Sequence, residues 1–262
     1  MARRAGVRYN APGRWRGPGG SALDYRSLRR SVAGGLDRLE AAFGRPRLGR
    51  SLPPLDELIL TILSQNTNDL NRDRAFRSLR QAFPTWESVM EADPARIEEA
   101  IRCGGLAHIK SRIIQEVLRR VRQERGRLDL DVLRRMPAEE ARRYLSGFRG
   151  VGDKTACCVL LFACGHAAFP VDTHIHRVAR RVGWVSSGAT PATSHAVLAG
   201  LIPASRYLVA HVNLITLGRR LCRLRNPDCP ACPLRRTCHH ARRGRPPLRG
   251  APRPMARAGR PA

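Results

Sequence analysis

The sequence predicts an all-α protein built from two helical domains. Apolar residues recur at helical spacing over most of the chain, and prolines and glycines interrupt this pattern at short intervals. No run of alternating apolar and polar residues is long enough for a sheet. A chain of 262 residues, 42% of them apolar, is long enough for one large or two modest domains with a buried core.

The predicted helices are short and follow one another closely. The first is the segment "LDELILTIL" at 55–63, whose composition is typical of a buried helix. Further helices are expected over 73–83, 95–102, 111–125 and 138–147, separated by Pro84, Pro94, Gly104, Gly105, Gly126 and Pro137. The segment "DKTACCVLLFAC" at 153–164 is apolar nearly all round, which predicts a helix in the centre of a domain. The last helices are expected over 173–182, ending at Gly183, and over 190–201 and 204–218.

The charge of the chain indicates a polyanionic partner. Lys and Arg number 48 against 21 Asp and Glu, which gives a net charge of +27 and a pI of about 11.6. Nucleic acid is the first candidate for this partner and a membrane surface is the second. No segment has the ~18 consecutive apolar residues of a spanning helix. The arginine-rich start lacks the apolar stretch of a secretory signal. We therefore expect a cytoplasmic, nucleoid-associated protein with no membrane contact.

Both ends of the chain are basic and poor in apolar residues. Residues 1–20 hold five arginines and residues 241–262 hold seven, with no acidic residue in either segment. Removing these twelve charges from +27 still leaves +15 on the middle of the chain. Segments of this composition bury too little apolar surface to fold, so disordered tails are expected over 1–24 and 241–262. They are either a by-product of an arginine-favouring genome or a non-specific DNA tether.

The eight cysteines fall into two groups. Cys103, Cys157, Cys158 and Cys164 are scattered and are expected to be small core residues in a reducing compartment. The other four, Cys222, Cys229, Cys232 and Cys238, form the pattern C-x6-C-x2-C-x5-C. Four thiolates so close together can bind one metal centre, either a structural zinc ion or a [4Fe–4S] cluster. Zinc sites more often use two C-x2-C pairs, so the spacing favours the cluster. The arginines of this loop would then present phosphate contacts.

The segment "FRGVGDKTA" reads as a helix, a tight turn and a second helix. Glycines at Gly150 and Gly152, on either side of Val151, permit positive φ and a close backbone approach. The amides of the turn and of the following helix start point outward together, which suits a DNA phosphate. The alternative is an ordinary glycine-containing corner between two helices.

Lys154 is one of only two lysines among the 48 basic residues. It lies in the first turn of the buried helix, where the helix dipole and desolvation both favour the neutral amine, which is the nucleophilic form. Arginine cannot take this role because its guanidinium stays protonated. The segment "PVDTHIHR" follows, and its Asp172 precedes a helix. The alternative interpretations are that Lys154 is an ordinary surface lysine near a helix start and that Asp172 is only a helix N-cap. As an ionised carboxylate, Asp172 would instead suit cleavage of an N-glycosidic bond.

These segments together resemble the endonuclease III family of the helix–hairpin–helix DNA glycosylase superfamily. The hairpin, the "FPVDTHIHRV" segment and the four-cysteine loop occur in the same order and at the same distances, and the similarity covers roughly residues 28–240. The resemblance implies two helical domains with a DNA-binding cleft between them. It implies a six-helix barrel at 46–165 that contains the helix–hairpin–helix, and a cluster domain formed by 25–45 and 166–240. It also implies a C-terminal [4Fe–4S] loop.

The resemblance also assigns roles to single residues. Lys154 matches the Schiff-base lysine and Asp172 the catalytic aspartate, and the hairpin binds phosphate through Gly150, Val151 and Gly152. The cluster ligands are matched by Cys222, Cys229, Cys232 and Cys238. The segment "LSQNTND" at 63–69 resembles the one that inserts a side chain into the DNA stack, here Gln65 or Asn66. The segment "GGLAHIK" at 104–110 resembles the second insertion loop, with Leu106 as the wedge and Lys110 near the DNA backbone. The chain departs from the family at Asp153, where a basic residue is common, and at Asn66, where glutamine is common.

The resemblance implies a monomeric base-excision repair enzyme acting on double-stranded DNA that contains damaged bases or abasic sites. It would remove damaged bases, oxidised pyrimidines first among them, and cut the strand at abasic sites by β-elimination through a lysine Schiff base. Three alternatives stay open. They are a monofunctional glycosylase for mismatched adenine, thymine or uracil, a non-catalytic DNA-binding protein, and an iron–sulfur electron carrier.

Overall fold

The computed structural model describes residues 15–16, 22–23, 25–46 and 51–242. Most of the predicted disordered tails, 1–24 and 241–262, lies outside these residues. Within the first tail, β1 (Trp15–Arg16) pairs antiparallel with β2 (Ala22–Leu23). These two-residue strands are the only strands in the described ranges, so the all-α prediction is confirmed.

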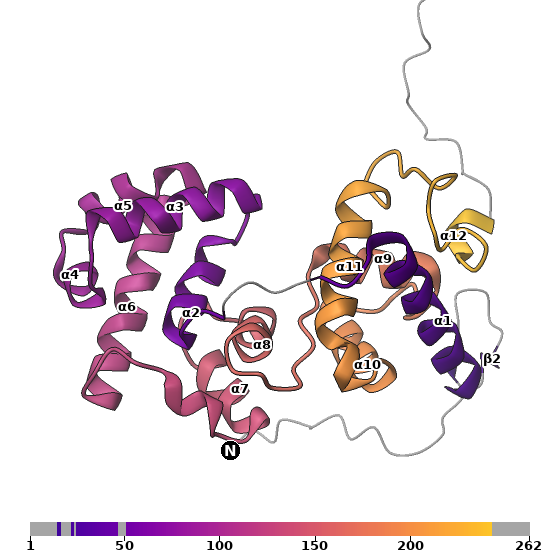
Figure 1. Cartoon of the computed structure of the whole chain (residues 1–262), viewed down its shortest axis with the longest axis horizontal. Helices are drawn as coiled ribbons and strands as arrows, with labels where there is room; N and C mark the ends of the chain where they lie inside the picture. Colours follow the sequence, from indigo (N-terminus) through magenta and orange to yellow (C-terminus); the bar gives the residue numbers. More distant parts are fainter. Residues whose placement is uncertain (1–14, 17–21, 24, 47–50, 243–262) are drawn as a thin grey trace, which may run out of the picture.

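Most of the described helices are joined by short loops, but longer segments at 163–172 and 221–238 precede α9 and α12 (Figure 1). They are α1 (Tyr25–Phe43), α2 (Pro54–Leu63), α3 (Asp69–Ala82), α4 (Trp86–Glu91), α5 (Pro94–Ile101), η1 (Arg102–Gly104), α6 (Ala107–Arg125), η2 (Asp131–Arg134), α7 (Ala138–Ser146), α8 (Asp153–Phe162), α9 (Thr173–Val182), α10 (Pro191–Leu201), η3 (Ala204–Arg206), α11 (Tyr207–Arg220) and α12 (His239–Arg242). No single helix among them is long and apolar enough to cross a membrane. Only α10 joined to the η3–α11 segment across a 110° bend passes that test.

Local sequence signals fix where the helices begin and end. Short polar side chains accept hydrogen bonds from the first free amides of α3, α4, α5, α9 and α10. Proline occupies the first turn of α2, α5 and α10, where a missing N–H costs nothing. Helices α6 and α9 end at Gly126 and Gly183, whose φ angles of +71° and +97° favour glycine.

The first of two hydrophobic cores lies among α2–α8. Apolar side chains between Leu55 and Ala168 form it, and α8 passes through its centre with Ala156, Val159 and Leu160 fully buried. α8 packs against α2 and α7 and also touches α11. In Figure 1, α8 lies between α2–α6 on the left and α9–α11 on the right.

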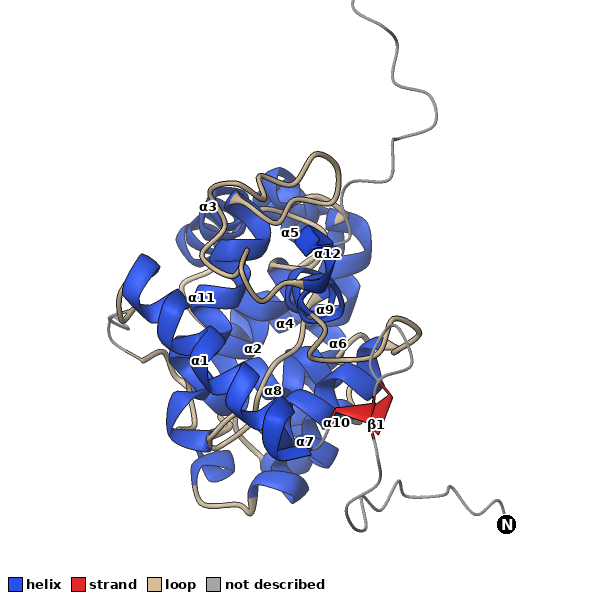
Figure 2. Cartoon of the chain, turned by 90° about the vertical axis from the view of Figure 1, so that its right-hand side faces the viewer, coloured by secondary structure: helices blue, strands red, loops and turns tan. Residues whose placement is uncertain are grey.

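The second core joins the two ends of the described chain. Side chains between Leu28 and Leu39 of α1 pack with side chains between Phe169 and Cys238. Figure 2 shows α1 and α10–α12 on this side of the molecule. The close packing of α1 requires Gly35, because a Cβ there would lie 2.3 Å from Cζ2 of Trp184. The domain boundaries at 45/46 and 165/166 stay predictions.

Candidate active site

The hairpin between α7 and α8 presents backbone rather than side chains. Gly150 has a φ of +75°, and a Cβ there would lie 2.7 Å from Cδ1 of Ile113, so both conformation and space require glycine. Val151 is buried and anchors the turn in the first core. Gly152 is exposed, and a Cβ there would meet nothing within 4 Å. The turn therefore leaves open space beside the amides that begin α8.

Lys154 and Asp172 occupy the starts of two helices. Lys154 is the second residue of α8 and is half-buried. Asp172 precedes α9, and its Oδ1 accepts a hydrogen bond from the Ile175 amide at 2.8 Å. Asp172 is thus a helix N-cap, and this occupies one of its two carboxylate oxygens.

Both side chains affect the pKa of one buried thiol, that of Cys158. Cys158 lies one helical turn after Lys154, and burial raises the pKa of its thiol. Lys154 lowers that pKa through its charge and a hydrogen bond, whereas Glu57 and Asp172 raise it. The charges of Lys154, Asp172 and Glu57 therefore all act on the thiol of Cys158. Sequence reasoning missed Glu57, which comes from α2.

A second buried group supports the segment before Asp172. Nδ1 of His211 on α11 donates to the Pro170 carbonyl at 2.9 Å, and its ring packs edge-on against Phe162 and Phe169. Complete burial lowers the pKa of His211 to about 4, which keeps the imidazole neutral. His211 was not predicted, because nothing in the local sequence distinguishes it from any other core histidine.

Two loop tips near the site have strained backbones. Asn66 and Leu106 have φ angles of +53° and +51°, a conformation that is a clear outlier for leucine. Both side chains project into solvent, with Leu106 49% exposed. Gln65 behaves differently, because its Nε2 donates to the Gly150 carbonyl at 3.0 Å. Gln65 is therefore committed to the hairpin, and Asn66 is the free side chain of the pair.

The structure corrects the expectation for Lys110. Only 1% of its surface is exposed, and its Nζ donates to the carbonyls of Leu63 at 2.7 Å and Gly104 at 2.9 Å. Burial also lowers its pKa. An ammonium enclosed in this way cannot reach a DNA phosphate. Lys110 instead ties the end of α2 to the loop that carries Leu106.

Charge pairs flank the hairpin and the Asn66 loop. Asp153, the departure from the family pattern, pairs with Arg142 at 2.6 Å, and Arg142 also pairs with Glu139 at 2.7 Å. The negative charge beside the hairpin is therefore matched by a neighbouring arginine. Asp69 at the start of α3 pairs with Arg219 of α11, which links the two cores beside the Asn66 loop.

The loop between α11 and α12 carries Cys222, Cys229, Cys232 and Cys238. All four thiols are free. Burial, together with the charges of the other three thiols, raises the pKa of Cys232 to about 11. Nη1 of Arg181 donates to the sulfur of Cys222 at 3.4 Å, which suits a thiolate. In the part of the chain that the structure describes, no three His, Cys, Asp or Glu side chains are placed to hold a single metal ion. Four thiols on one loop with an arginine donor fit the donor set of a [4Fe–4S] cluster.

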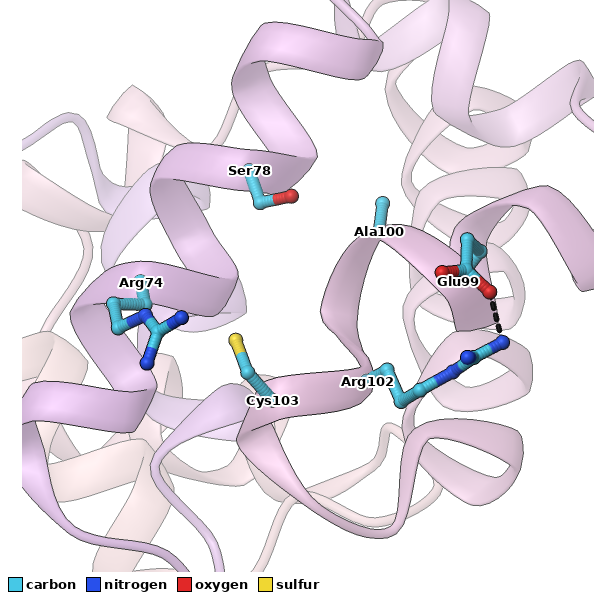
Figure 3. A pocket seen from close by; sticks show the side chains of 6 residues that line it. All are labelled: Arg74, Ser78, Glu99, Ala100, Arg102 and Cys103. Carbon is cyan, nitrogen blue, oxygen red and sulfur yellow. Dashed lines mark hydrogen bonds and ion pairs between the residues drawn. The ribbon is translucent and has the colours of Figure 1, made fainter.

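The surface pocket in Figure 3 lies apart from these residues. It is lined by Arg74, Ser78, Glu99, Ala100, Arg102 and Cys103. These come from α3, α5 and η1, and none comes from the helices that carry Lys154 or Asp172. An ion pair between Arg102 and Glu99 closes one side of it.

A family match covers the centre of the chain. Residues 59–204 match the family described as "HhH-GPD superfamily base excision DNA repair protein". The matched segment contains the Asn66 loop, the hairpin, Lys154 and Asp172, and it ends before the four-cysteine loop.

Relatives by sequence occur in plants and bacteria. An Arabidopsis thaliana protein named "Putative DNA glycosylase" is 47% identical over 165 residues, which are 63% of this chain and 56% of that protein. "DNA glycosylase/AP lyase ROS1" of the same plant is 33% identical over 172 residues, 59% of this chain but 12% of that protein. Endonuclease III of Thermotoga maritima is 32% identical over 201 residues, 76% of this chain and 88% of the enzyme. The chain thus spans about half the length of the first relative and a small part of the second.

Solved structures show the same fold. A trapped endonuclease III–DNA covalent intermediate has a TM-score of 0.72 at 27% identity, covering 82% of this chain and 97% of that one. A thermostable thymine-DNA glycosylase has a TM-score of 0.67 at 19% identity, which supports the fold alone. The fold of the chain is therefore that of endonuclease III.

Proposed function

The chain belongs to the HhH-GPD superfamily of base excision DNA repair proteins, and from this membership we propose that it is a bifunctional DNA glycosylase and abasic-site lyase. Its partner would be double-stranded DNA carrying damaged bases, oxidised pyrimidines in particular, or abasic sites. The net charge of +27 supports a polyanionic partner. The observation that carries the proposal is the placement of Lys154 in the first turn of α8, directly after the glycine hairpin, and of Asp172 at the start of α9. The charges of both side chains act on the buried thiol of Cys158.

Lys154 supplies the nucleophile in this proposal. A base inside a duplex is out of reach, so the nucleotide is flipped out of the stack before chemistry. The Lys154 amine attacks C1′, and the N–C1′ bond to the base breaks with its electron pair leaving on the base. Asp172 stabilises the positive charge that develops on the sugar. The nitrogen then loses a proton, and the C1′–O4′ bond opens with its pair on O4′, which takes up a proton, so that an imine joins Nζ and C1′. Loss of a C2′ proton then breaks the C3′–O bond, whose pair leaves on the 3′ phosphate, and this cuts the strand.

The loops around Lys154 hold the DNA open. The hairpin at 150–152 binds a backbone phosphate through its amides. Leu106 and Asn66 fill the space left by the flipped nucleotide, and their left-handed backbones and exposed side chains support this role. Gln65 keeps the Asn66 loop joined to the hairpin.

A [4Fe–4S] cluster would be held by Cys222, Cys229, Cys232 and Cys238. When bound, the cluster would supply a rigid loop and, if reduced or oxidised, an electron. Arg181 orients this loop by donating to the carbonyls of Arg223 at 2.7 Å and Leu224 at 2.9 Å.

The test is borohydride trapping on four duplexes, which carry an abasic site, thymine glycol, uracil or mismatched adenine. The parent protein should form a covalent product on the abasic and thymine glycol duplexes. Lys154→Ala should lose trapping but keep DNA binding, because a lysine imine is the trapped species. Lys154→Arg is the matched control, because it keeps the charge and removes the free amine.

Other outcomes refute the proposal. Undiminished trapping by Lys154→Ala would place the nucleophile elsewhere. Base release without trapping by the parent would make the protein a monofunctional glycosylase, and binding without base release would make it non-catalytic.

A further inference from the structure

Glu57 is a carboxylate beside the candidate active site to which no role has been assigned. It lies in the first turn of α2 and is half-buried, and its Oε1 accepts a hydrogen bond from Thr61 Oγ1 at 3.2 Å. Within the described ranges, no basic side chain forms an ion pair with it, although the chain has 48 basic residues. A carboxylate left unpaired among so many cations needs a physical reason.

The packing of α2 on α8 places Glu57 opposite the helix that carries Lys154. At one end, Ser51 Oγ donates to the Phe162 carbonyl at 3.0 Å. At the other end, Gln65 Nε2 donates to the Gly150 carbonyl at 3.0 Å. The two helices therefore run antiparallel, and Glu57 faces the middle of α8, within one turn of Lys154.

The charges around Glu57 agree with this placement. The groups that face it are Thr61 from its own helix, Arg72 from α3, and Lys154, Cys158 and Cys164 from α8 and the residues after it. Burial raises the pKa of Glu57 to about 7, against the opposing effects of Thr61, Arg72 and Lys154. A carboxylate of this basicity is ionised at mildly alkaline pH and still accepts a proton readily.

We propose that Glu57 is the base that removes the C2′ proton during strand cleavage, an inference that rests on the imine proposed at Lys154. In that imine C1′ is bonded to Nζ, so C2′ is only two bonds from the nitrogen of Lys154, which lies on the helix that α2 packs against. Asp172 is less available for this step, because its Oδ1 caps α9. The two carboxylates thus have different roles, since Asp172 stabilises positive charge and Glu57 accepts the proton.

The step balances with the groups present. The C2′–H bond breaks, its proton goes to the Glu57 carboxylate, and its electron pair forms a C1′=C2′ bond as the iminium nitrogen takes back the C=N pair. The nitrogen pair then restores C=N, the C1′=C2′ pair moves to C2′=C3′, and the C3′–O bond breaks with its pair leaving on the 3′ phosphate. Water hydrolyses the imine to release Lys154, and Glu57 returns its proton to solvent.

A preformed abasic duplex tests this inference, because it bypasses base removal. Glu57→Gln keeps the shape and the Thr61 hydrogen bond but cannot accept the proton. Strand cleavage should slow by about 10²-fold, a typical contribution of a general base, while borohydride trapping persists because the imine still forms. Asp56→Asn is the matched control. It removes the same charge from the neighbouring position of α2 and keeps the oxygen that accepts from Trp86 Nε1 at 2.8 Å, so it should cleave at the parental rate.

The pH dependence of strand cleavage gives a second readout that a structural role would not produce. Glu57 acts when deprotonated, so the cleavage rate of the parent should rise with pH and level off above about pH 7. The cleavage rate of Glu57→Gln should not show this rise. A variant that cleaves at the parental rate overturns the inference, and so does one that melts normally but loses trapping and cleavage together. If the cleavage rate of the parent does not rise with pH below about pH 7, the inference is overturned even if the variant does not fold. A parent that is never trapped refutes the proposed function instead.

Discussion

Replacing Lys110 by methionine should destabilise the protein without removing a DNA contact. Methionine keeps the unbranched stem but leaves the carbonyls of Leu63 and Gly104 without their donor. Each buried acceptor left unsatisfied costs about 1–3 kcal/mol, and part of this is offset because a charge no longer needs to be buried. We expect a net loss of about 2–4 kcal/mol. For a folded unit of this size that lowers Tm by roughly 5–15 °C.

Thermal melts and salt-dependent DNA binding together test this reasoning. A lysine that contacts a phosphate would, when removed, reduce the slope of log K against log salt by about 1. Because Lys110 is enclosed, the slope should not change. Arg112→Met is the control, because this cation on the same helix is exposed and its loss should alter stability by no more than about 0.5 kcal/mol. A Lys110→Met protein that melts like the parent but has a reduced slope would refute the structural role.

Two further substitutions test the site and the metal centre. Asp172→Asn should fold and melt within about 1 kcal/mol of the parent, because asparagine caps a helix as well as aspartate does. Its single-turnover excision of a damaged base should nevertheless slow by about 10² or more; an unchanged rate would leave Asp172 as a cap alone. The purified parent should be brown with absorbance near about 400 nm, and Cys229→Ser should lose that colour and some solubility. A colourless parent with stoichiometric zinc would contradict the cluster.

Helix positions were the most predictable part of the fold. The apolar spacing predicted α2, α3 and α5–α11 to within a few residues, and it gave the observed bounds for α9. Helix α4 has only six residues, too few for a helical period to appear. The segment 204–218 was predicted as one helix, but it begins with the 3₁₀ turn η3 before α11. Short-range geometry of this kind leaves no trace in hydrophobic spacing.

The candidate site was only partly predictable, because its members come from separate helices. Lys154 and Asp172 lie in segments with their own signals, a glycine turn and a helix start. Glu57 has no such signal, since acidic residues are common in the first turn of any helix. Only the antiparallel packing of α2 on α8 shows that Glu57 lies against the helix that carries Lys154. Lys110 was misplaced because the resemblance of 104–110 to an insertion loop does not show which way a side chain points, and lysine is almost never fully buried unless it has partners.

Each of the two lysines lies at a position where an arginine would not serve as well. Almost all of the basic residues of the chain are arginines, whose guanidinium is suited to exposed carboxylates and phosphates. The ammonium of Lys110 is buried and donates to two backbone carbonyls. Lys154 lies where the proposed mechanism needs a neutral amine, a form that arginine does not reach. One lysine therefore fixes the loop that would hold the DNA open, and the other would attack the sugar that this opening exposes. The scarcity of lysine singles out both positions in the sequence, but only the fold shows that Lys110 is buried between two carbonyls and that Lys154 is not.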